Sequence, residues 1–425
     1  MADGTTMARV REIVKSDSSR RFLVVSAPGK RYGGEQKVTD LLYLAHAQLM
    51  ASGSLGEPFE KVKRRFLGIV GELGLDSFDM ETLLQETEQE ILKQRKEAFT
   101  VSRGEYLSAK LFAAFLELPF VDPSEVIRFS RDGKLLTEQT YALTQAALNG
   151  KTGAVLAGFY GVNERGEIQT FSRGGGDISG AIVARAVGAD VYENWTDVSG
   201  FLVCDPRIVE NPSKINALTF QELTELSRMG ASVLHTESIY PVCEADIPVR
   251  IKNTFRPQDD GTLIIPTSKY RGNCPVTGIA GKKNYTALSL ENPKMGGVEP
   301  LERVLQALRQ NNSFCEYVFS ENDKTLLVFD EAQAKKGNAL KIIEQTEAFG
   351  QVKIIKNLAL IAIVGQGLKG SVGATARIFK AISQAGVNIK VISCGASELK
   401  LLLGVDGEDY ERTIRAIYDE FYKEW

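Results

Sequence analysis

The stretch SRGGGDISGAIVARAVGADVYENWTDVSGFLVCDPR, residues 172–207, decides how this chain is interpreted. It opens with three consecutive glycines, continues as an apolar-periodic helix, and then becomes a strand that ends at Thr196 and Asp197. Glycines let the backbone turn sharply and approach an anion closely, and a helix that starts just after them directs free N–H groups at that anion. The stretch therefore has the chemistry of a phosphate-handling site in an α/β fold.

Two interpretations fit the glycine loop when it is taken by itself. Asp177 stands where an N-cap would stand, so the loop can be a tight strand–helix turn with a capping aspartate. Asp197 stands where a strand meets the crevice of an open α/β sheet, which favours a ligand site. The strings R-G-G-G-D, W-T-D-V and D-P-R all fall within this one stretch, and their coincidence favours the ligand site.

The composition is that of an ordinary soluble protein with two or three domains. The chain has 425 residues, of which 43% are hydrophobic and 25% charged. A formal net charge of −3 and a pI of about 5.8 argue against an electrostatic grip on nucleic acid. No apolar stretch is long enough to cross a bilayer and no signal-peptide pattern opens the chain, so we expect a cytoplasmic protein without a membrane partner.

Cysteine and histidine usage points away from metal and imidazole chemistry. The five cysteines are odd in number, far apart and without a C-x-x-C spacing, which indicates reduced thiols rather than a disulfide framework or a zinc site. Only two histidines are present, His46 and His235, and both lie in apolar-periodic stretches. We therefore expect no resident metal site and no mechanism built on a histidine base.

Up to about residue 266, helix and strand patterns alternate. This alternation predicts a mostly parallel sheet with helices on both faces. The expected elements are a helix over residues 6–15, a strand over 21–26, a helix over 41–50, a largely helical stretch over 57–118, and strands at 120–121 and 154–159.

Beyond about residue 275 the chain repeats itself. Residues 277–349 and 358–421 each show the order strand, helix, strand, strand, helix, which predicts a tandem of ferredoxin-like units. Such units are also consistent with a structural or dimerising module. Residues 365–370 match G-x-G-x-x-G, but the βαββα order and the lack of an acidic residue about 20 positions later favour a turn of the repeat over a dinucleotide site.

Together these motifs resemble the aspartate kinases of the amino acid kinase family, in their monofunctional bacterial form. The resemblance covers nearly the whole chain and is most specific at residues 102–105, 172–207 and 228–235. It implies a three-layer, open, mostly parallel sheet of the amino acid kinase fold, followed by two ferredoxin-like βαββαβ ACT domains. The implied bounds are residues 1–270 for the kinase domain, and 275–350 and 351–425 for the two ACT domains.

The resemblance assigns the substrate side of the site to Ser26, Thr39, Glu105 and Arg173. The planar guanidinium of Arg173 suits a bidentate pair with the substrate carboxylate, and the Glu105 carboxylate suits its ammonium. Arg173 and Asp177 are the expected catalytic pair.

Local patterns offer simpler roles for two of these substrate residues. Ser102-x-x-Glu105 matches a capping box before an apolar helix, and Thr39 matches an N-cap.

The same resemblance assigns the nucleotide side of the site. Its expected residues are Gly174, Gly175, Thr196, Asp197, Leu202, Arg207, Ser232 and Val233. The better-known family pattern has a lysine where Ser232 and Val233 stand, so the contact there differs in kind.

One family segment does not occur among the 425 residues. Aspartate kinases open with a strand followed by K-F-G-G-[ST]-S, whose lysine and glycines hold the ATP phosphates, and residues 1–4 align with the positions just after it. Two hypotheses follow: the true start lies upstream, or the chain is an inactive relative retained for its ACT domains. Either way we expect a central strand to be missing from the sheet.

The activity implied by the resemblance is ATP-dependent phosphorylation of L-aspartate to 4-phospho-L-aspartate, with Mg²⁺ on the ATP phosphates. This is the entry step to lysine, threonine and methionine synthesis. Residues 392–398, ISCGASE, resemble an effector-binding string of the family, which favours feedback control. The resemblance further implies lysine rather than threonine as the effector, and a homodimer or homotetramer joined through ACT domains. The alternatives are another amino acid kinase, such as glutamate 5-kinase or uridylate kinase, and a non-catalytic amino-acid sensor.

Overall fold

The structure is a computed structural model of the chain. It describes all residues except Arg173, Ser232, Arg271, Asn273, 292–298, 322–323, 333–350, Ala396 and 424–425. The expected site residues Arg173 and Ser232, and nearly all of the helix expected at the end of the first repeat, lie outside the described residues.

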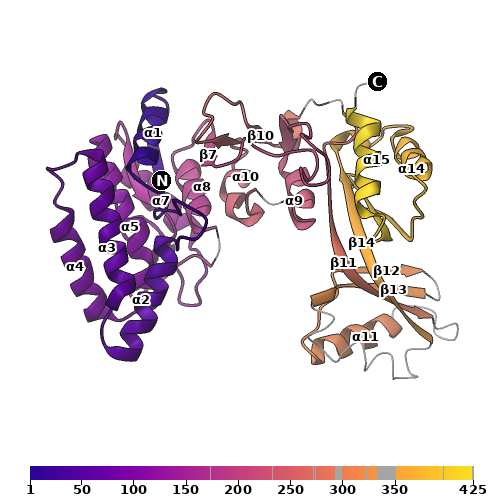
Figure 1. Cartoon of the computed structure of the whole chain (residues 1–425), viewed down its shortest axis with the longest axis horizontal. Helices are drawn as coiled ribbons and strands as arrows, with labels where there is room; N and C mark the ends of the chain where they lie inside the picture. The colour runs from indigo at the N-terminus through magenta and orange to yellow at the C-terminus, as the bar shows by residue number, and fades with distance from the viewer. Residues whose placement is uncertain are drawn as a thin grey trace. The chain divides into compact units, whose positions relative to one another are not determined.

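The described chain forms two compact units (Figure 1). The first unit comprises Met1–Gly200, Asn216–Phe220 and Val233–Tyr270, and the second comprises Phe201–Ile215, Gln221–Ser232 and Arg271–Trp425. No described helix is both long and apolar enough to span a membrane.

The first unit alternates helices and short strands. Its helices are α1 (Gly4–Lys15), α2 (Val38–Ser52), α3 (Gly56–Leu73), α4 (Met80–Gln94), α5 (Glu97–Leu116), α6 (Pro123–Val126), α7 (Thr137–Leu148), α8 (Gly175–Ala186), η1 (Thr236–Ile239), α10 (Tyr240–Glu244) and η2 (Thr267–Lys269). Its strands are β1 (Phe22–Val25), β2 (Phe120–Val121), β3 (Arg128–Phe129), β4 (Ala154–Ala157), β5 (Tyr160–Asn163), β6 (Ile168–Thr170), β7 (Tyr192–Thr196), β8 (Ala217–Thr219), β9 (Val249–Asn253) and β10 (Thr262–Ile265).

Two of its sheets consist entirely or mostly of parallel strands. One has the order β1-β4-β2 with every pair parallel, and the other has the order β7-β9-β10-β8, in which only β9 and β10 are antiparallel. A third small sheet, β3-β5-β6, has no strand paired with either of these two sheets.

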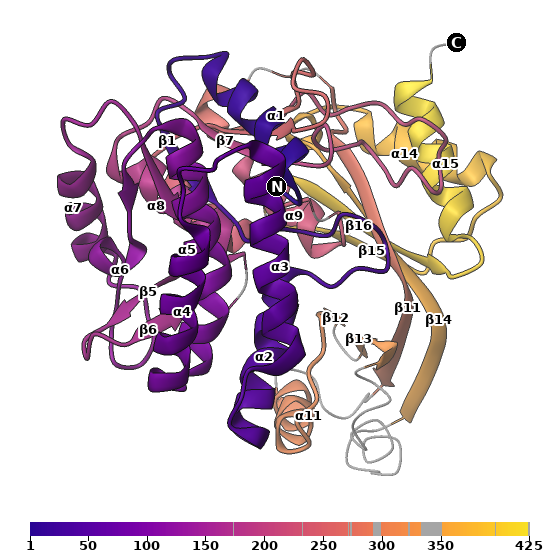
Figure 2. The same cartoon turned by 60° about the vertical axis from the view of Figure 1, so that its left-hand side comes forward.

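The unit has three layers, because alternate side chains of β4 belong to two different hydrophobic cores. Val155 and Ala157 belong to a core built with α2, α3 and α5, whereas Ala154 and Leu156 belong to a second core built with α7 and α8. Because successive side chains of a strand point to opposite faces, the two helix groups cover opposite faces of this sheet (Figure 2). The predicted three-layer α/β architecture is confirmed.

Three local predictions about helix starts are wrong. Helix α5 begins at Glu97, so Ser102 lies inside it and donates its hydroxyl to the Phe99 carbonyl at 2.7 Å rather than capping an end. Helix α2 begins one residue before Thr39, and its N-cap is Lys37. Helix α8 has Gly174 as its N-cap, which places Asp177 in the first turn.

The second unit is built on one antiparallel sheet. Its elements are α9 (Phe220–Arg228), β11 (Gly278–Glu291), α11 (Glu299–Gln310), β12 (Tyr317–Glu321), β13 (Lys324–Asp330), β14 (Gln351–Val364), η4 (Gln366–Leu368), α14 (Ala374–Gln384), β15 (Val391–Cys394), β16 (Lys400–Asp406) and α15 (Tyr410–Tyr422). The sheet order is β12-β13-β11-β14-β16-β15.

The two repeats share their long strands. Strands β11 and β14 have 14 residues each and pair with one another along their length, with an irregularity near Tyr285 (Figure 1). The second half of β11 pairs with β13, and the second half of β14 pairs with β16. The first half of β14 therefore completes the sheet of the first repeat, next to β11, β13 and β12. The first half of β11 completes the sheet of the second repeat, next to β14, β16 and β15.

The G-x-G-x-x-G match lies in this shared sheet. Gly365 directly follows β14 and is the N-cap of the short η4, and β14 pairs antiparallel with both of its neighbours. The segment is thus a turn of the repeat and not the start of a parallel βαβ unit.

Candidate active site

The glycine loop is shaped by two close approaches. Gly174 has φ 57°, and a Cβ there would overlap the hydroxyl of Ser238. A Cβ on Gly176 would lie 2.8 Å from the Oγ of Ser26, the residue that follows β1. The positive φ and the close Ser238 hydroxyl favour glycine at position 174, and the contact at Gly176 places the loop directly against the end of β1.

Asp177 is held by the neighbouring strand β7. Its Oδ1 accepts a hydrogen bond of 2.8 Å from Nδ2 of Asn194, and its backbone carbonyl accepts one of 3.2 Å from the Tyr192 hydroxyl. Burial raises the pKa of Asp177, while the Asn194 hydrogen bond and the charge of His235 act in the opposite direction. The carboxylate thus has a fixed orientation beside the N-terminus of α8.

Glu105 is a deeply buried ionisable group near the end of β1. It is 6% exposed, and burial raises its pKa from 4.5 to about 7. A hydrogen bond from the Ala27 backbone N–H and the charge of Arg103 lower this pKa in part. Its Oε2 is buried and has no hydrogen-bond partner among the described residues, so this oxygen is available to a ligand cation.

Tight packing at Gly104 brings the substrate-side elements together. A Cβ on Gly104 would lie 2.9 Å from the Cβ of Ala27 and 3.3 Å from Cγ1 of Val38. Ser26 and Thr39 directly adjoin these two contact residues in the chain. Three of the substrate residues expected from the sequence, Ser26, Thr39 and Glu105, therefore belong to segments that pack together at the carboxyl end of β1.

The expected nucleotide residues of the first unit lie at the end of β7. Thr196 is the last residue of β7, and its hydroxyl donates to the exposed Asp197 carboxylate at 3.2 Å. The Thr196 carbonyl accepts the Thr254 N–H at 2.9 Å, which fixes this strand end. Carboxyl ends of parallel strands are where open α/β sheets bind ligands. Val233 is half-buried in the same unit.

The remaining expected nucleotide residues belong to the second unit. Leu202 forms an isolated β-bridge with Lys214. Arg207 is highly exposed, and its guanidinium pairs with Asp205 at 2.6 Å. This pairing lowers the pKa of Asp205.

Several contributors were not predicted from the sequence. Asn194 and Ser238 support the glycine loop, and Arg103 is 6% exposed inside a cage of rings from Phe99, Tyr106 and Tyr160. The alternation of β7 is the only available signal for Asn194, which lies two residues before Thr196. Phe99 and Tyr106 lie four residues before and three residues after Arg103 on α5, which is a local helical spacing, whereas Tyr160 comes from β5 and carries no local signal.

Comparison with known proteins agrees with this geometry. The amino acid kinase family model matches residues 1–253, and an ACT-domain model matches residues 361–421. Aspartokinase 3 of Bacillus subtilis strain 168 is 35% identical over 442 residues, which cover 99% of this chain and 96% of that protein. The chain belongs to the aspartokinase family.

Solved aspartokinase structures share its fold. The aspartate kinase of Clostridium acetobutylicum matches with a TM-score of 0.94 and 38% identity, over 99% of this chain and 97% of that one. Escherichia coli aspartokinase III matches in two complexes with the same coverage and 25% identity. Its R-state complex with aspartate and ADP has a TM-score of 0.72, and its T-state complex with lysine and aspartate 0.76.

Proposed function

We propose that this aspartokinase transfers the γ-phosphoryl group of ATP to L-aspartate, giving 4-phospho-L-aspartate and ADP. The observation that carries the proposal is the buried Glu105 carboxyl with one unpaired oxygen, beside a glycine loop at the carboxyl end of β1. The relatives support the substrate pair, because Escherichia coli aspartokinase III has been solved with aspartate and ADP.

On the substrate side, Glu105 receives the aspartate ammonium. A carboxyl whose pKa is about 7 becomes fully ionised when a cation binds next to it, so the ammonium supplies the charge that burial has made costly. Ser26 and Thr39 add hydroxyl contacts, and Arg173 pairs with the substrate carboxylate. These contacts fix the reacting carboxylate oxygen in place.

On the nucleotide side, the start of α8 faces the phosphates. The backbone N–H groups at Gly174 and Gly175 and the positive end of the helix dipole stabilise negative charge there. Asp177 contacts the reacting groups, held in place by Asn194. Phosphoryl transfer depends mainly on positioning and charge stabilisation, which suits these groups.

The remaining ATP contacts are assigned to individual residues. The proposed ATP contacts are Thr196, Asp197, Leu202, Arg207, Ser232 and Val233. Mg²⁺ enters with the ATP phosphates as part of the substrate. In the described part of the chain, no group of three or more histidine, cysteine, aspartate or glutamate side chains could hold a resident metal.

The ACT domains supply regulation in this proposal. The kinase domain lies within residues 1–270, and the ACT domains at 275–350 and 351–425 bind a feedback amino acid, with lysine favoured over threonine. Escherichia coli aspartokinase III was solved with lysine in its T-state, which supports this choice. The proposed enzyme is cytoplasmic, assembles through its ACT domains as a homodimer or homotetramer, and serves lysine, threonine and methionine synthesis.

The test is aspartate-dependent ADP release, with 4-phospho-L-aspartate identified by mass. Glu105→Gln should raise KM for aspartate at least about tenfold, because a buried charge-assisted hydrogen bond is lost. Glu97→Gln, an exposed change on the same helix, should leave KM unaltered. Turnover of L-glutamate instead of aspartate would favour another amino acid kinase, and aspartate binding without turnover would favour the sensor.

A further inference from the structure

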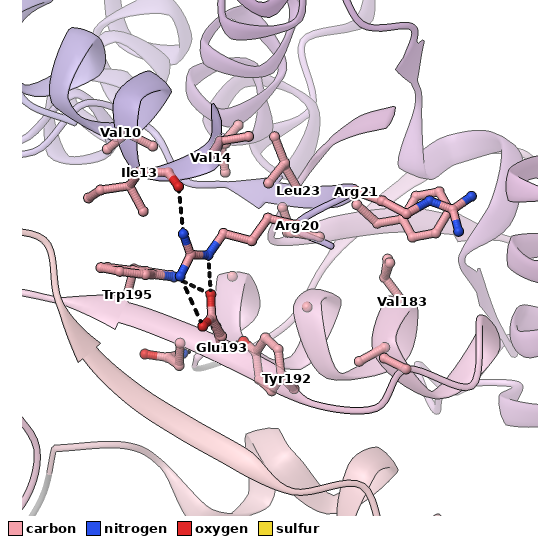
Figure 3. A pocket seen from close by; sticks show the side chains of 18 of the residues that line it. Val10, Ile13, Val14, Arg20, Arg21, Leu23, Val183, Tyr192, Glu193 and Trp195 are labelled. Carbon is pink, nitrogen blue, oxygen red and sulfur yellow. Dashed lines mark hydrogen bonds and ion pairs between the residues drawn. The ribbon is translucent and has the colours of Figure 1, made fainter. Parts of the chain in front are cut away.

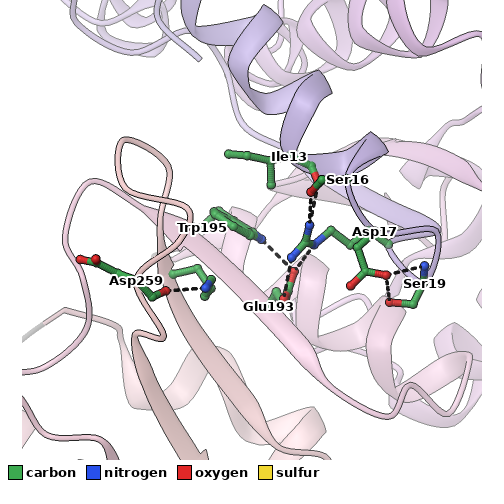
Figure 4. A network of polar contacts seen from close by, with 9 residues as sticks. Ile13, Ser16, Asp17, Ser19, Glu193, Trp195 and Asp259 are labelled. Carbon is green, nitrogen blue, oxygen red and sulfur yellow. Dashed lines mark hydrogen bonds and ion pairs between the residues drawn. The ribbon is translucent and has the colours of Figure 1, made fainter.

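Two clusters of arginine and glutamate side chains flank β1, one at each end of the strand. At the amino end, Arg20 forms an ion pair of 2.7 Å with Glu193 of β7, and the Trp195 indole donates to the same carboxylate at 3.0 Å (Figures 3 and 4). The cavity beside this cluster, about 390 Å³ between β1 and β7, corresponds to the central strand expected to be missing (Figure 3). Open α/β sheets bind ligands at the carboxyl ends of their strands, so the other cluster is the one placed to act on the site.

The carboxyl end of β1 continues into a loop, residues 27–37, that joins two of the proposed substrate residues. Ser26 precedes this loop, and Thr39 follows it in the first turn of α2. The loop returns to its own start, because the Val38 N–H donates to the Pro28 carbonyl at 3.4 Å. The place of one substrate hydroxyl relative to the other therefore depends on how the 27–37 loop is closed.

Glu35 is the centre of the polar contacts in this loop. Its Oε1 accepts hydrogen bonds from Nε and Nη2 of Arg31 at 3.0 and 2.6 Å, and its Oε2 accepts one from the Arg31 backbone N–H at 2.7 Å. The guanidinium of Arg65, on helix α3, pairs with the same Oε1. The Arg31 hydrogen bonds and the charge of Arg65 lower the pKa of Glu35 from 4.5 to about 2.

Arg65 binds both limbs of the loop at once. Its Nη2 pairs with Glu35 near the end of the loop, and its Nη1 donates to the Gly29 carbonyl near the start, at 3.1 Å. The same Nη1 also donates to the Ala2 carbonyl at 2.9 Å. The planar guanidinium offers several donors in fixed directions, which suits one side chain that holds three acceptors.

Arg65 is buried in the apolar face of its helix. The buried residues of α3 are Phe59, Val62, Arg65, Phe66 and Ile69. Only 5% of the Arg65 side chain and 10% of the Glu35 side chain are exposed. A buried arginine stays charged and is costly without an anion beside it, so the packing of α3 favours a loop that keeps Glu35 in this place.

We propose that Arg65 is a positioning residue for the substrate and acts through the 27–37 loop. By binding Glu35 and the Gly29 carbonyl, it closes the loop against α3. The closed loop sets the separation of the two substrate hydroxyls at its ends. Loop closure is independent of the proposed function, whereas its effect on aspartate rests on that function.

The two ends of the loop are held unequally. At its start, the Ser108 hydroxyl of α5 donates to the Ser26 carbonyl at 2.9 Å. At its end, α2 begins at an N-cap, Lys37, whose side chain makes no cap hydrogen bond. The first turn of α2, which carries Thr39, therefore depends more on the loop, and we expect it to move most when Arg65 is replaced.

The test uses single and paired variants of the buried ion pair. Arg65→Met leaves Glu35 with Arg31, and Glu35→Gln leaves the buried guanidinium without the Glu35 carboxylate. The double variant removes both charges, so it should recover much of the stability that Glu35→Gln loses. The control, Glu57→Gln, breaks the Arg64–Glu57 pair on the same helix, whose side chains are 65% and 61% exposed.

All three variants of the buried pair should raise KM for aspartate about tenfold and change KM for ATP by less than about twofold, because misplaced contacts weaken only the substrate's own site. Amide hydrogen exchange at residues 31, 35 and 38, whose N–H groups bond within the loop, should quicken at least about tenfold. The control should change none of these values. In the double variant stability should return while KM for aspartate stays high, which a purely structural ion pair would not produce.

A KM for aspartate that recovers together with stability would overturn the proposal, because the pair would then serve the fold alone. Unchanged exchange in the loop would also overturn it. Calorimetry with L-aspartate separates this failure from that of the proposed function. A wild-type chain that binds no aspartate would overturn the proposed function and the effect on substrate, whereas loop closure is decided by amide exchange without any substrate.

Discussion

The Nδ2 of Asn194 lies 2.8 Å from the Oδ1 of Asp177, and this hydrogen bond connects strand β7 to the first turn of α8. Helix α8 begins in the glycine loop, and β7 is the strand that follows it in sequence. The bond favours the ionised carboxylate against the burial that raises its pKa. It therefore controls both the orientation of Asp177 and the pH range in which it is charged.

Replacing Asn194 should shift the acid side of the activity profile. In Asn194→Ala, the pKa of Asp177 should rise further, because the hydrogen bond that lowers it is gone. Activity should then fall at a higher pH than in the wild type, and kcat at pH 8 should drop by about tenfold to a hundredfold. A pH–rate profile of kcat and kcat/KM measures this, with the exposed Asn149→Ala as control. Parallel profiles would show that Asn194 has no influence on Asp177.

Glu105 should make the protein less stable as pH rises. Its folded pKa of about 7 exceeds the unfolded value of 4.5, so the folded state binds more protons between these two pH values. The free energy of unfolding should therefore fall as pH rises from about 4.5 to 7, by on the order of 3 kcal/mol. Glu105→Gln should remove that part of the pH dependence and be the more stable protein at pH 8. Urea unfolding at several pH values measures it.

The matched control for this change is Glu97→Gln on the exposed start of the same helix. It should retain the full pH dependence of the wild type. Identical slopes in the wild type and in Glu105→Gln would contradict the raised pKa of Glu105.

Arg103 should influence Glu105 through its charge. Its guanidinium carbon lies 4.3 Å from the ring centroid of Phe99 and 4.4 Å from that of Tyr106. Arg103→Met should lower the free energy of unfolding by about 1–3 kcal/mol through lost cation–π contacts. It should also raise the pKa of Glu105, because the nearby positive charge is removed.

Arg103→Lys separates the two effects. It retains the charge but loses the planar stacking, so it should lose stability while the pH transition of Glu105 stays near its wild-type position. The transition can be followed by urea unfolding against pH. A transition that moves equally in both variants would show that packing, not charge, sets this pKa.

The contact between Gly176 and Ser26 predicts a non-additive pair. Gly176→Ala places a methyl group 2.8 Å from the Ser26 hydroxyl oxygen, which should cost about 1–3 kcal/mol of stability. Ser26→Gly removes that oxygen, so the double variant should recover part of the loss. Gly68→Ala in α3, where a Cβ meets open space, should instead leave stability unchanged or raise it. A double-mutant cycle by thermal or chemical unfolding gives the coupling, and a coupling near zero would contradict the contact.

Sequence patterns predicted the elements around the glycine loop well. The strand expected to end near Thr196 is β7, because apolar periodicity followed by a polar turn is a local property. The start of α5 was missed because Ser102 and Glu105 imitate a capping box, while the apolar pattern of the helix already begins at Phe99. The sequence could not distinguish a helix that starts at Ser102 from one in which Ser102 is an internal residue, since both fit the S-x-x-E pattern.

Part of the site could not be predicted from local patterns. The glycine at the start of α8 takes the N-cap position because it alone fits against Ser238, a residue far away in the chain. The pKa of Glu105 depends on packing between α5 and the segment after β1. Both depend on three-dimensional proximity and leave no trace in spacing.

The exchange of halves between β11 and β14 limits how this chain can be engineered. The sequence repeat suggests a seam near residue 350, yet β14 begins at Gln351 by pairing with β11 of the preceding repeat. A chimera joined at that seam would take an edge strand away from each half of the sheet. Grafting the sensory module of a relative would require moving the stretch from β11 through α15 as one piece. The two repeats are separate in sequence, but they can be transferred to another protein only together.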